Sequence, residues 1–164
     1  MSLTAPQASL LIEPEVPADG PVVEALATAA FGPGRFAKTA ERLRERARLA
    51  AGFVARDGGE TIGSVRLWDI VVGETPALFL GPIAVAGERR KGGLGAQLVK
   101  ACIDHARDTG SPGILLVGEA SYFDRFGFIL APHARLPGPV DQRRVFWLGL
   151  GAPAAPTGDV RPLA

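Results

Sequence analysis

The segment best equipped for chemistry is residues 80–96, where the sequence reads LGPIAVAGERRKGGLGA. An apolar, strand-like run ends at Val85, and a helix is expected to begin through three closely spaced glycines: Gly92, Gly93 and Gly95. Glycines leave backbone N–H groups uncovered by side chains, and the positive end of the helix dipole adds to them. This combination predicts a pocket for a phosphate or pyrophosphate. Three basic residues are placed to reinforce it: Arg89, Arg90 and Lys91.

The spacing of these glycines separates three phosphate-binding motifs. A P-loop requires Gly-Lys followed by Ser or Thr, whereas Gly95 is followed by Ala-Gln. The dinucleotide fingerprint G-x-G-x-x-G/A is broken because its third position is Leu98. The pattern that fits is R-x-x-G-x-G, formed by Arg90, Gly93 and Gly95.

The elements that must position this pocket form a mixed α/β domain. Hydrophobic periodicity predicts helices over residues 17–31, about 37–50, 92–109 and 119–126. Strands are predicted over residues 10–12, 53–56, 61–72, 77–85, 114–117, 128–130 and 144–150. Asp57-Gly58-Gly59 is typical of a hairpin turn, because glycine accepts positive φ. The arginine-rich second helix is interpreted as a solvated face whose charge Glu41 and Glu45 neutralise.

Composition bounds the class of protein. The 164 residues suit one domain, predicted over residues 1–150, with an Ala/Pro/Gly-rich tail over 151–164 that is expected to lie on the surface or to be disordered. With 18 Lys and Arg against 17 Asp and Glu, no general field attracts nucleic acid or an anionic membrane. No apolar run approaches the roughly 18 residues of a membrane helix. The single cysteine, Cys102, fits a reducing cytoplasm, so a soluble cytoplasmic protein is expected.

A second motif turns this pattern into a family resemblance. The short strand 113–117 is followed by Tyr122-Phe-Asp-Arg-Phe-Gly127-Phe128, which is similar to a Y-x-x-x-G-F segment. Together with R-x-x-G-x-G at the start of a helix, it resembles the GNAT superfamily of acetyl-CoA-dependent acetyltransferases, and within it the small YhbS-like members. The resemblance covers roughly residues 8–150.

The resemblance implies the GNAT fold, with a mixed, mostly antiparallel central sheet whose one parallel β-α-β unit is splayed to form the acetyl-CoA cleft. Gly81-Pro82 then marks a bulge, since proline cannot donate to a sheet ladder. Main-chain groups of Ile83 and Val85, with Ala84 between them, would bind the pantetheine arm, and an N–H there would polarise the thioester carbonyl. The pyrophosphate would be held by the amides of seven consecutive residues: Arg90, Lys91, Gly92, Gly93, Leu94, Gly95 and Ala96.

The expected general acid is displaced by one residue. The family places a tyrosine four residues before the glycine of G-F, and that position is Phe123, which has no proton to donate. Its neighbour Tyr122 is the only tyrosine, and adjacent helical residues point about 100° apart. Three hypotheses stay open: Tyr122 reaches the sulfur through a shifted helix, water protonates the leaving group, or CoA binds without efficient turnover. A structural role for Tyr122 on the cleft floor is an equal alternative.

A general base must take a proton from the acceptor ammonium. Glu119, just past the short parallel strand, and Asp69, on the long hairpin strand, are candidates by placement, while an exposed or salt-bridged carboxylate explains each as well. Arg66 and Trp68 share one strand face and are candidates for an acceptor pocket or for plain structural roles. No metal is expected, since His133 has no partner at metal-ligand spacing.

The sequence therefore predicts an N-acetyltransferase that moves the acetyl group of acetyl-CoA to a primary amine by direct attack. Tyr122 and Glu119 are its candidate catalytic residues. The alternative is a CoA or acyl-CoA binding domain with little or no catalysis. The expected partners are acetyl-CoA and a small amine or peptide amine, with no nucleic acid and no membrane, and a homodimer is compatible with the sequence. The acceptor is not encoded in a motif; the first two helices, their loop and the closing strands would choose it.

Overall fold

The computed structural model describes residues 10–151 and 154–163. Its strands are β1 (Leu10–Pro14), β2 (Arg48–Asp57), β3 (Glu60–Val72), β4 (Thr75–Val85), β5 (Gly113–Val117), β6 (Ile129–Leu130), β7 (Ala134–Arg135), β8 (Val145–Gly149) and β9 (Gly158–Pro162). Its α-helices are α2 (Gly20–Phe31), α3 (Thr39–Arg46), α4 (Leu94–Asp108) and α5 (Ala120–Phe123). Short 3₁₀ helices are η1 (Pro17–Asp19), η2 (Pro33–Ala37), η3 (Gly87–Gly92), η4 (Asp124–Phe126) and η5 (Gln142–Arg144).

The strands form one mixed sheet whose main path runs β1-β2-β3-β4-β5-β8-β6. Neighbours on this path are antiparallel except β4 and β5, which are parallel and are connected through α4. β9 extends the sheet from β3 and pairs in parallel with the short β7. The predicted mixed, mostly antiparallel sheet with a central β-α-β unit is confirmed.

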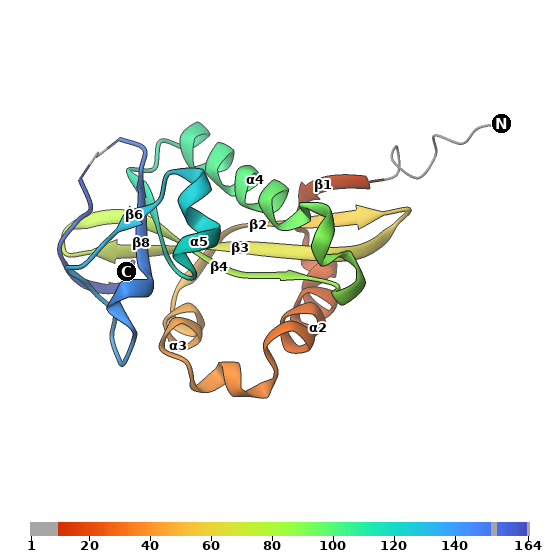
Figure 1. Cartoon of the computed structure of the whole chain (residues 1–164), viewed down its shortest axis with the longest axis horizontal. Helices are drawn as coiled ribbons and strands as arrows, with labels where there is room; N and C mark the ends of the chain where they lie inside the picture. Colours follow the sequence, from red (N-terminus) through yellow and green to blue (C-terminus); the bar gives the residue numbers. More distant parts are fainter. Residues whose placement is uncertain (1–9, 152–153, 164) are drawn as a thin grey trace.

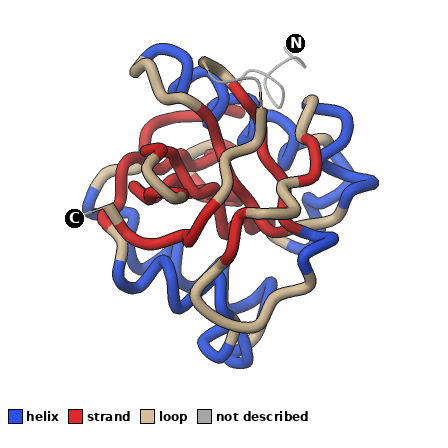
Figure 2. Tube along the Cα trace, turned by 90° about the vertical axis from the view of Figure 1, so that its left-hand side faces the viewer, coloured by secondary structure: helices blue, strands red, loops and turns tan. Residues whose placement is uncertain are grey.

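Helices cover both faces of the sheet. In Figure 1, α4 and α5 lie on one side of the central strands, and α2 and α3 lie on the other. Figure 2, turned by 90°, shows strands crossing the middle of the molecule with helices around them. The two helix pairs therefore approach β4 and β5 from opposite faces.

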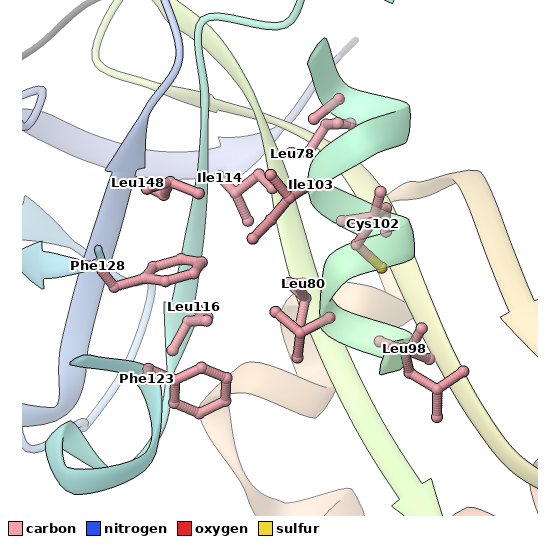
Figure 3. Packing of buried hydrophobic residues seen from close by; sticks show 14 of the residues in the cluster. Leu78, Leu80, Leu98, Cys102, Ile103, Ile114, Leu116, Phe123, Phe128 and Leu148 are labelled. Carbon is pink, nitrogen blue, oxygen red and sulfur yellow. The ribbon is translucent and has the colours of Figure 1, made fainter. Parts of the chain in front are cut away.

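The stripe of α4 that faces the sheet is apolar. Leu94, Leu98, Cys102 and Ala106 are all buried, as their spacing predicts. In Figure 3, Leu98, Cys102 and Ile103 on α4 lie toward the strands that carry Leu80 and Ile114. Each fully buried leucine contributes roughly 1.5–3 kcal/mol through loss of contact with water. This packing fixes α4, and with it the glycine-rich turn at its start, on the sheet.

A second core lies on the opposite face. It contains Leu43 of α3, Phe79 of β4 and Trp147 of β8, all fully buried or nearly so. A side chain at Gly113 would overlap the Trp147 ring, which is why β5 begins with glycine. This core anchors α3 beneath β4, close to the point where β4 and β5 separate.

Two boundaries differ from the sequence prediction. The second helix ends at Arg46 and not near Ala50, because residues from Arg48 onward pair with β3 as part of β2. Ladder pairing across a long hairpin overrides the helical preference of an alanine-rich segment. The expectation that the tail lies on the surface or is disordered is wrong for Val160, which is buried where residues 158–162 form β9 and pair with β3 and β7.

None of the helices in the described ranges has the length and apolar content needed to cross a membrane.

Candidate active site

The parallel strands β4 and β5 separate after a short pairing. They are matched only at Leu78 with Ile114 and at Phe79 with Leu115. β4 then continues to Val85 along β3, while β5 continues to Val117 along β8. A wedge-shaped opening therefore begins just past Phe79, in the centre of the sheet.

A bulge in β4 sits at the start of this opening. Val65 faces Ile83 and Leu67 faces Leu80, so Gly81 and Pro82 together lie opposite the single residue Arg66. Two residues against one define a β-bulge, which bends its strand. Gly81 has a φ of 137°, a conformation that L side chains rarely adopt. The bulge predicted from Gly81-Pro82 is thus present.

A cavity of about 610 Å³ lies at the opening. One wall comes from the α2–α3 side: Ala30, Phe31, Arg35, Lys38, Ala40, Glu41 and Arg44. The strands contribute Leu80, Gly81, Pro82, Ile83, Leu116 and Val117. The remaining lining follows β5 or comes from the segment before β8: Gly118, Glu119, Tyr122, Phe123 and Arg144. The cavity thus lies between the α2–α3 segment and the separated strands.

The glycine-rich turn adjoins the same end of β4. Gly93 has a left-handed conformation, with φ of 75°, and precedes the first residue of α4. Space is open where side chains at Gly92 and Gly93 would lie, and both residues are exposed. The backbone N–H groups in the first turn of any helix have no acceptor within the helix. In α4 these N–H groups belong to residues 94–96. This backbone is suited to hold an anion.

Of the three basic residues before this turn, Arg89 has a described side chain. Arg89 forms an ion pair with Asp57, with 2.6 Å between a guanidinium nitrogen and a carboxylate oxygen. Arg89 is therefore engaged with the β2–β3 turn. The side chains of Arg90 and Lys91 lie outside the described part of the chain, so their predicted contact with a pyrophosphate stays a prediction.

Tyr122 joins the cavity to the glycine-rich turn. Its ring lines the cavity, and its hydroxyl lies over Gly95, where any side chain would come within 2.8 Å of it. Partial burial raises the pKa of the Tyr122 phenol above its ordinary value, an effect that the nearby Arg125 opposes. Phe123 is buried and packs against Phe126 and Phe128. The one hydroxyl-bearing aromatic therefore lies on α5 beside the start of α4.

The two candidate bases lie in different places. Glu119 precedes α5, lines the cavity and pairs with Arg144 at 3.1 Å, with 69% of its side chain exposed. Asp69 pairs with Arg48 at 2.7 Å and lines a separate cavity near His105. Only Glu119 among these two carboxylates is at the opening between β4 and β5.

Sequence reasoning missed the charged wall of the cavity. The solvated-face interpretation of the second helix fails for Glu41 and Arg44, whose side chains are only 12% and 13% exposed. Position 44 falls between Leu43 and Ala47 on the apolar stripe that begins at Ala40, at helical spacings of i, i+3, i+4 and i+7. Its place on this stripe was the sequence feature that could have predicted a partly buried Arg44 side chain.

A smaller cavity of about 230 Å³ adjoins this wall. Arg66 and Trp68 line it together, as their shared strand face predicts, along with Pro82 of the bulge. Arg35, Glu41 and Arg44 line both cavities. Arg66 is held by Glu15 at 2.7 Å, and the indole of Trp68 donates to Gly81, so both side chains are occupied by structural partners.

Metal-ligating side chains do not gather in the part of the chain that the structure describes. Across residues 10–151 and 154–163, no group of three or more His, Cys, Asp or Glu residues is placed to hold a metal ion. Cys102 lies in the core against the sheet, and burial raises the pKa of its thiol.

The separated parallel strands, the bulge and the glycine-rich turn define a member of the acetyltransferase (GNAT) family, whose profile matches residues 22–128. The chain belongs to this family and is an acetyl-CoA-dependent acyltransferase.

Relatives support this membership. The uncharacterized N-acetyltransferase YhbS of Escherichia coli strain K12 is 35% identical over 127 residues, which are 76% of each chain. The uncharacterized N-acetyltransferase YjhQ of the same strain is 29% identical and covers 87% of this chain and 86% of its own.

Solved structures share the fold. The crystal structure of Escherichia coli YhbS in complex with CoA matches with a TM-score of 0.79 and 32% identity, covering 94% of this chain and 90% of that one. A GNAT family acetyltransferase from Brucella melitensis, in complex with acetyl-CoA, matches with a TM-score of 0.74, 24% identity and coverage of 94% and 96%. At this identity the second likeness concerns the fold.

Proposed function

We propose that the protein transfers the acetyl group of acetyl-CoA to a primary amine by direct attack, without a covalent enzyme intermediate. The observation that carries this proposal is the opening between β4 and β5, which holds a cavity of about 610 Å³ whose lining residue Tyr122 also contacts the glycine-rich turn at Gly95. The one cysteine, Cys102, is fully buried on the face of α4 that packs on the sheet and is not available as an acyl carrier. A cytoplasmic location is part of the proposal, in keeping with a chain that has one cysteine.

The cofactor contacts are proposed for two backbone segments. Ile83, Ala84 and Val85 lie just after the bulge, and their main chain would bind the pantetheine arm. Seven residues would hold the pyrophosphate through backbone amides: Arg90, Lys91, Gly92, Gly93, Leu94, Gly95 and Ala96. Open space at Gly92 and Gly93 supports this assignment, because a diphosphate needs close approach to the backbone.

Bound acetyl-CoA supplies an activated acyl group as a thioester. The neutral amine nitrogen forms a bond to the carbonyl carbon, the carbon–sulfur bond breaks, and the sulfur leaves as a thiolate that takes up one proton. The nitrogen loses one proton as it becomes an amide, and this proton returns through water to the group that protonated the thiolate. Tyr122 is the proposed donor of the proton that the thiolate takes up: a phenol is protonated at neutral pH, and burial raises the pKa of Tyr122 above its ordinary 10.0. Glu119, directly or through water, is the proposed acceptor of the proton that the ammonium loses before attack.

The second candidate function is CoA or acyl-CoA binding with little turnover. One observation favours it: Phe123 occupies the position of the expected acid, and the Tyr122 hydroxyl lies over the first turn of α4. If Tyr122 does not reach the sulfur, CoA would bind while transfer stays slow.

Thiol release from acetyl-CoA separates the two functions. We expect calorimetry to show CoA binding, and a panel of amines to raise thiol release above the rate of acetyl-CoA hydrolysis. Mass spectrometry should find the added acetyl group on the amine nitrogen. Binding of CoA with no amine-dependent release for any member of the panel would contradict the transferase proposal and favour the binding domain. No detectable CoA binding would contradict both.

A further inference from the structure

Six alternating charged side chains run from the residue after β1 to the cavity. Their order is Glu15, Arg66, Glu24, Arg35, Glu41 and Arg44. The successive nitrogen–oxygen distances are 2.7, 3.1, 2.6, 3.1 and 3.2 Å. Arg66 and Arg35 each lie between two carboxylates. This series of ion pairs ends at Arg44, which contacts a single carboxylate.

Arg44 is therefore the arginine of the series with the fewest carboxylate partners. Its one partner, Glu41, uses the same oxygen to accept from Arg35. The Nε atoms of Arg44 and Arg35 are both buried without a hydrogen-bond partner among the described residues, but Arg35 pairs with two carboxylates and Arg44 with one. Removing a guanidinium from water is unfavourable unless charges and hydrogen bonds compensate for it. One further anion at Arg44 would complete the alternation.

The guanidinium of Arg44 faces the reaction centre of the proposed transferase. It lies over the Phe79 ring, at 5.4 Å from the centroid, and fills the space in which a side chain at Gly81 would lie. Gly81 comes two residues before Ile83, whose backbone is proposed to bind the cofactor arm. A group bound by Arg44 would thus be beside the expected acyl group.

The charge of the cavity wall also favours an anion. Four basic side chains line it, against two acidic ones, Glu41 and Glu119. Arg35 and Arg144 are already paired, and Lys38 is exposed at the rim. An amine with no negative group would meet a net positive wall, which repels its ammonium form. An acceptor that carries its own anion avoids this repulsion.

We propose that Arg44 binds a carboxylate of the acceptor, so that the acceptor is an amine with a carboxylate nearby, such as a free amino acid. This assignment rests on the proposed transferase function. A planar guanidinium matches a carboxylate through two parallel N–H to O contacts, which an amide cannot reproduce. Burial lowers the pKa of Arg44 to about 10, so it is still charged at neutral pH.

The test compares amino acids with their amides as acceptors. The two differ in one charged group, and the readout is thiol release from acetyl-CoA. We expect the wild-type enzyme to prefer the carboxylate forms by about tenfold or more in kcat/KM. Arg44→Gln should remove this preference, chiefly through KM. Arg42→Gln is the matched control, because Arg42 is an exposed arginine on the same helix. Wild-type preference for amides, or an unchanged preference in Arg44→Gln, would overturn the proposal.

Two further measurements separate this assignment from folding and from the transferase function. Arg44→Lys keeps the charge without the planar fork, so we expect it to retain part of the preference. Thermal melting shows whether each variant is folded, and calorimetry shows whether it binds CoA. If no amine is acetylated, the transferase proposal fails, and titration of CoA-bound protein with an N-acetyl amino acid and its amide still decides the role of Arg44. Selective binding of the acid in wild type, lost in Arg44→Gln, supports the carboxylate site; equal binding overturns it.

Discussion

The indole Nε1–H of Trp68 on β3 donates a hydrogen bond of 2.7 Å to the carbonyl oxygen of Gly81 in the β4 bulge. Ladder pairing between β3 and β4 is interrupted at this point, because Gly81 and Pro82 lie opposite Arg66. The indole therefore replaces part of the lost backbone pairing. It holds the bulge in the position from which β4 leaves β5.

Trp68→Phe should weaken this arrangement while keeping an aromatic ring. We expect the free energy of unfolding to fall by about 0.5–1.5 kcal/mol, the usual contribution of one hydrogen bond. Because the bulge shapes the opening, CoA affinity should fall as well. Urea unfolding and calorimetry measure the two effects, and a variant with wild-type values in both would show that the bulge is held by other contacts.

Gly92→Asp tests the proposed pyrophosphate site. The position is open and its backbone does not require glycine, so the fold should be retained. A carboxylate beside a diphosphate should weaken CoA binding by about tenfold or more through like-charge repulsion. Gly20→Asp, at the first residue of α2, adds the same charge at an equally open position and serves as the control. Equal CoA affinity in the two variants would argue against the site.

Tyr122→Phe tests the proposed acid. If Tyr122 protonates the thiolate, kcat should fall about hundredfold. The wild-type kcat should decline at high pH as the phenol ionises, and burial moves this decline above the ordinary tyrosine pKa of 10.0. The variant should lack that decline. A pH profile of kcat that is the same in both proteins would assign Tyr122 a structural role only.

Glu119→Gln tests the proposed base against a matched partner. Removing the carboxylate should lower kcat/KM by about hundredfold, most clearly below the pKa of the amine. Arg144→Gln breaks the same ion pair but keeps the carboxylate, so its effect should be much smaller. Similar losses in both variants would indicate that the pair matters for structure and that another group or water takes the proton.

Asp19 links stability to pH. Hydrogen bonds from Arg56 and from the backbone N–H of Val16 hold the pKa of Asp19 below its ordinary 3.8. The unfolded chain therefore binds this proton more readily, so ionised Asp19 stabilises the fold above pH 3.8 and loses this effect as pH falls through the folded pKa. Asp19→Asn should melt at a lower temperature than wild type at pH 7, and the difference should shrink below pH 3.8. Equal melting temperatures of Asp19→Asn and wild type at pH 7 would contradict this role of Asp19.

The sequence was most informative where one segment determines its own conformation. The glycines before α4, the apolar stripe of α4 and the β2–β3 turn each carry a local signal, and the structure confirms all three. The end of α3 and the strand β9 were predicted wrongly, because both depend on pairing with β3. In those segments, distant hydrogen bonds decide between conformations that the local sequence leaves nearly equal.

The candidate site divides in the same way. Its backbone elements, the bulge at Gly81-Pro82 and the turn at Gly93, were predicted because proline cannot donate to a sheet ladder and glycine permits a positive φ. The inward position of Arg44 was missed, because charge alone favours solvent unless a buried partner is known. That partner, Glu41, is one helical turn away, but its burial depends on α3 packing beneath β4.

The last strand also limits how this protein can vary. Val160 is 1% exposed and β9 pairs with the end of β3, whereas Leu163, just beyond, is 40% exposed. The backbone N–H of Leu163 still donates to the carbonyl of Asp69 in β3. Losing residues 158–162 would uncover the edge of β3 beside the second core, so related chains should rarely be shortened at this end.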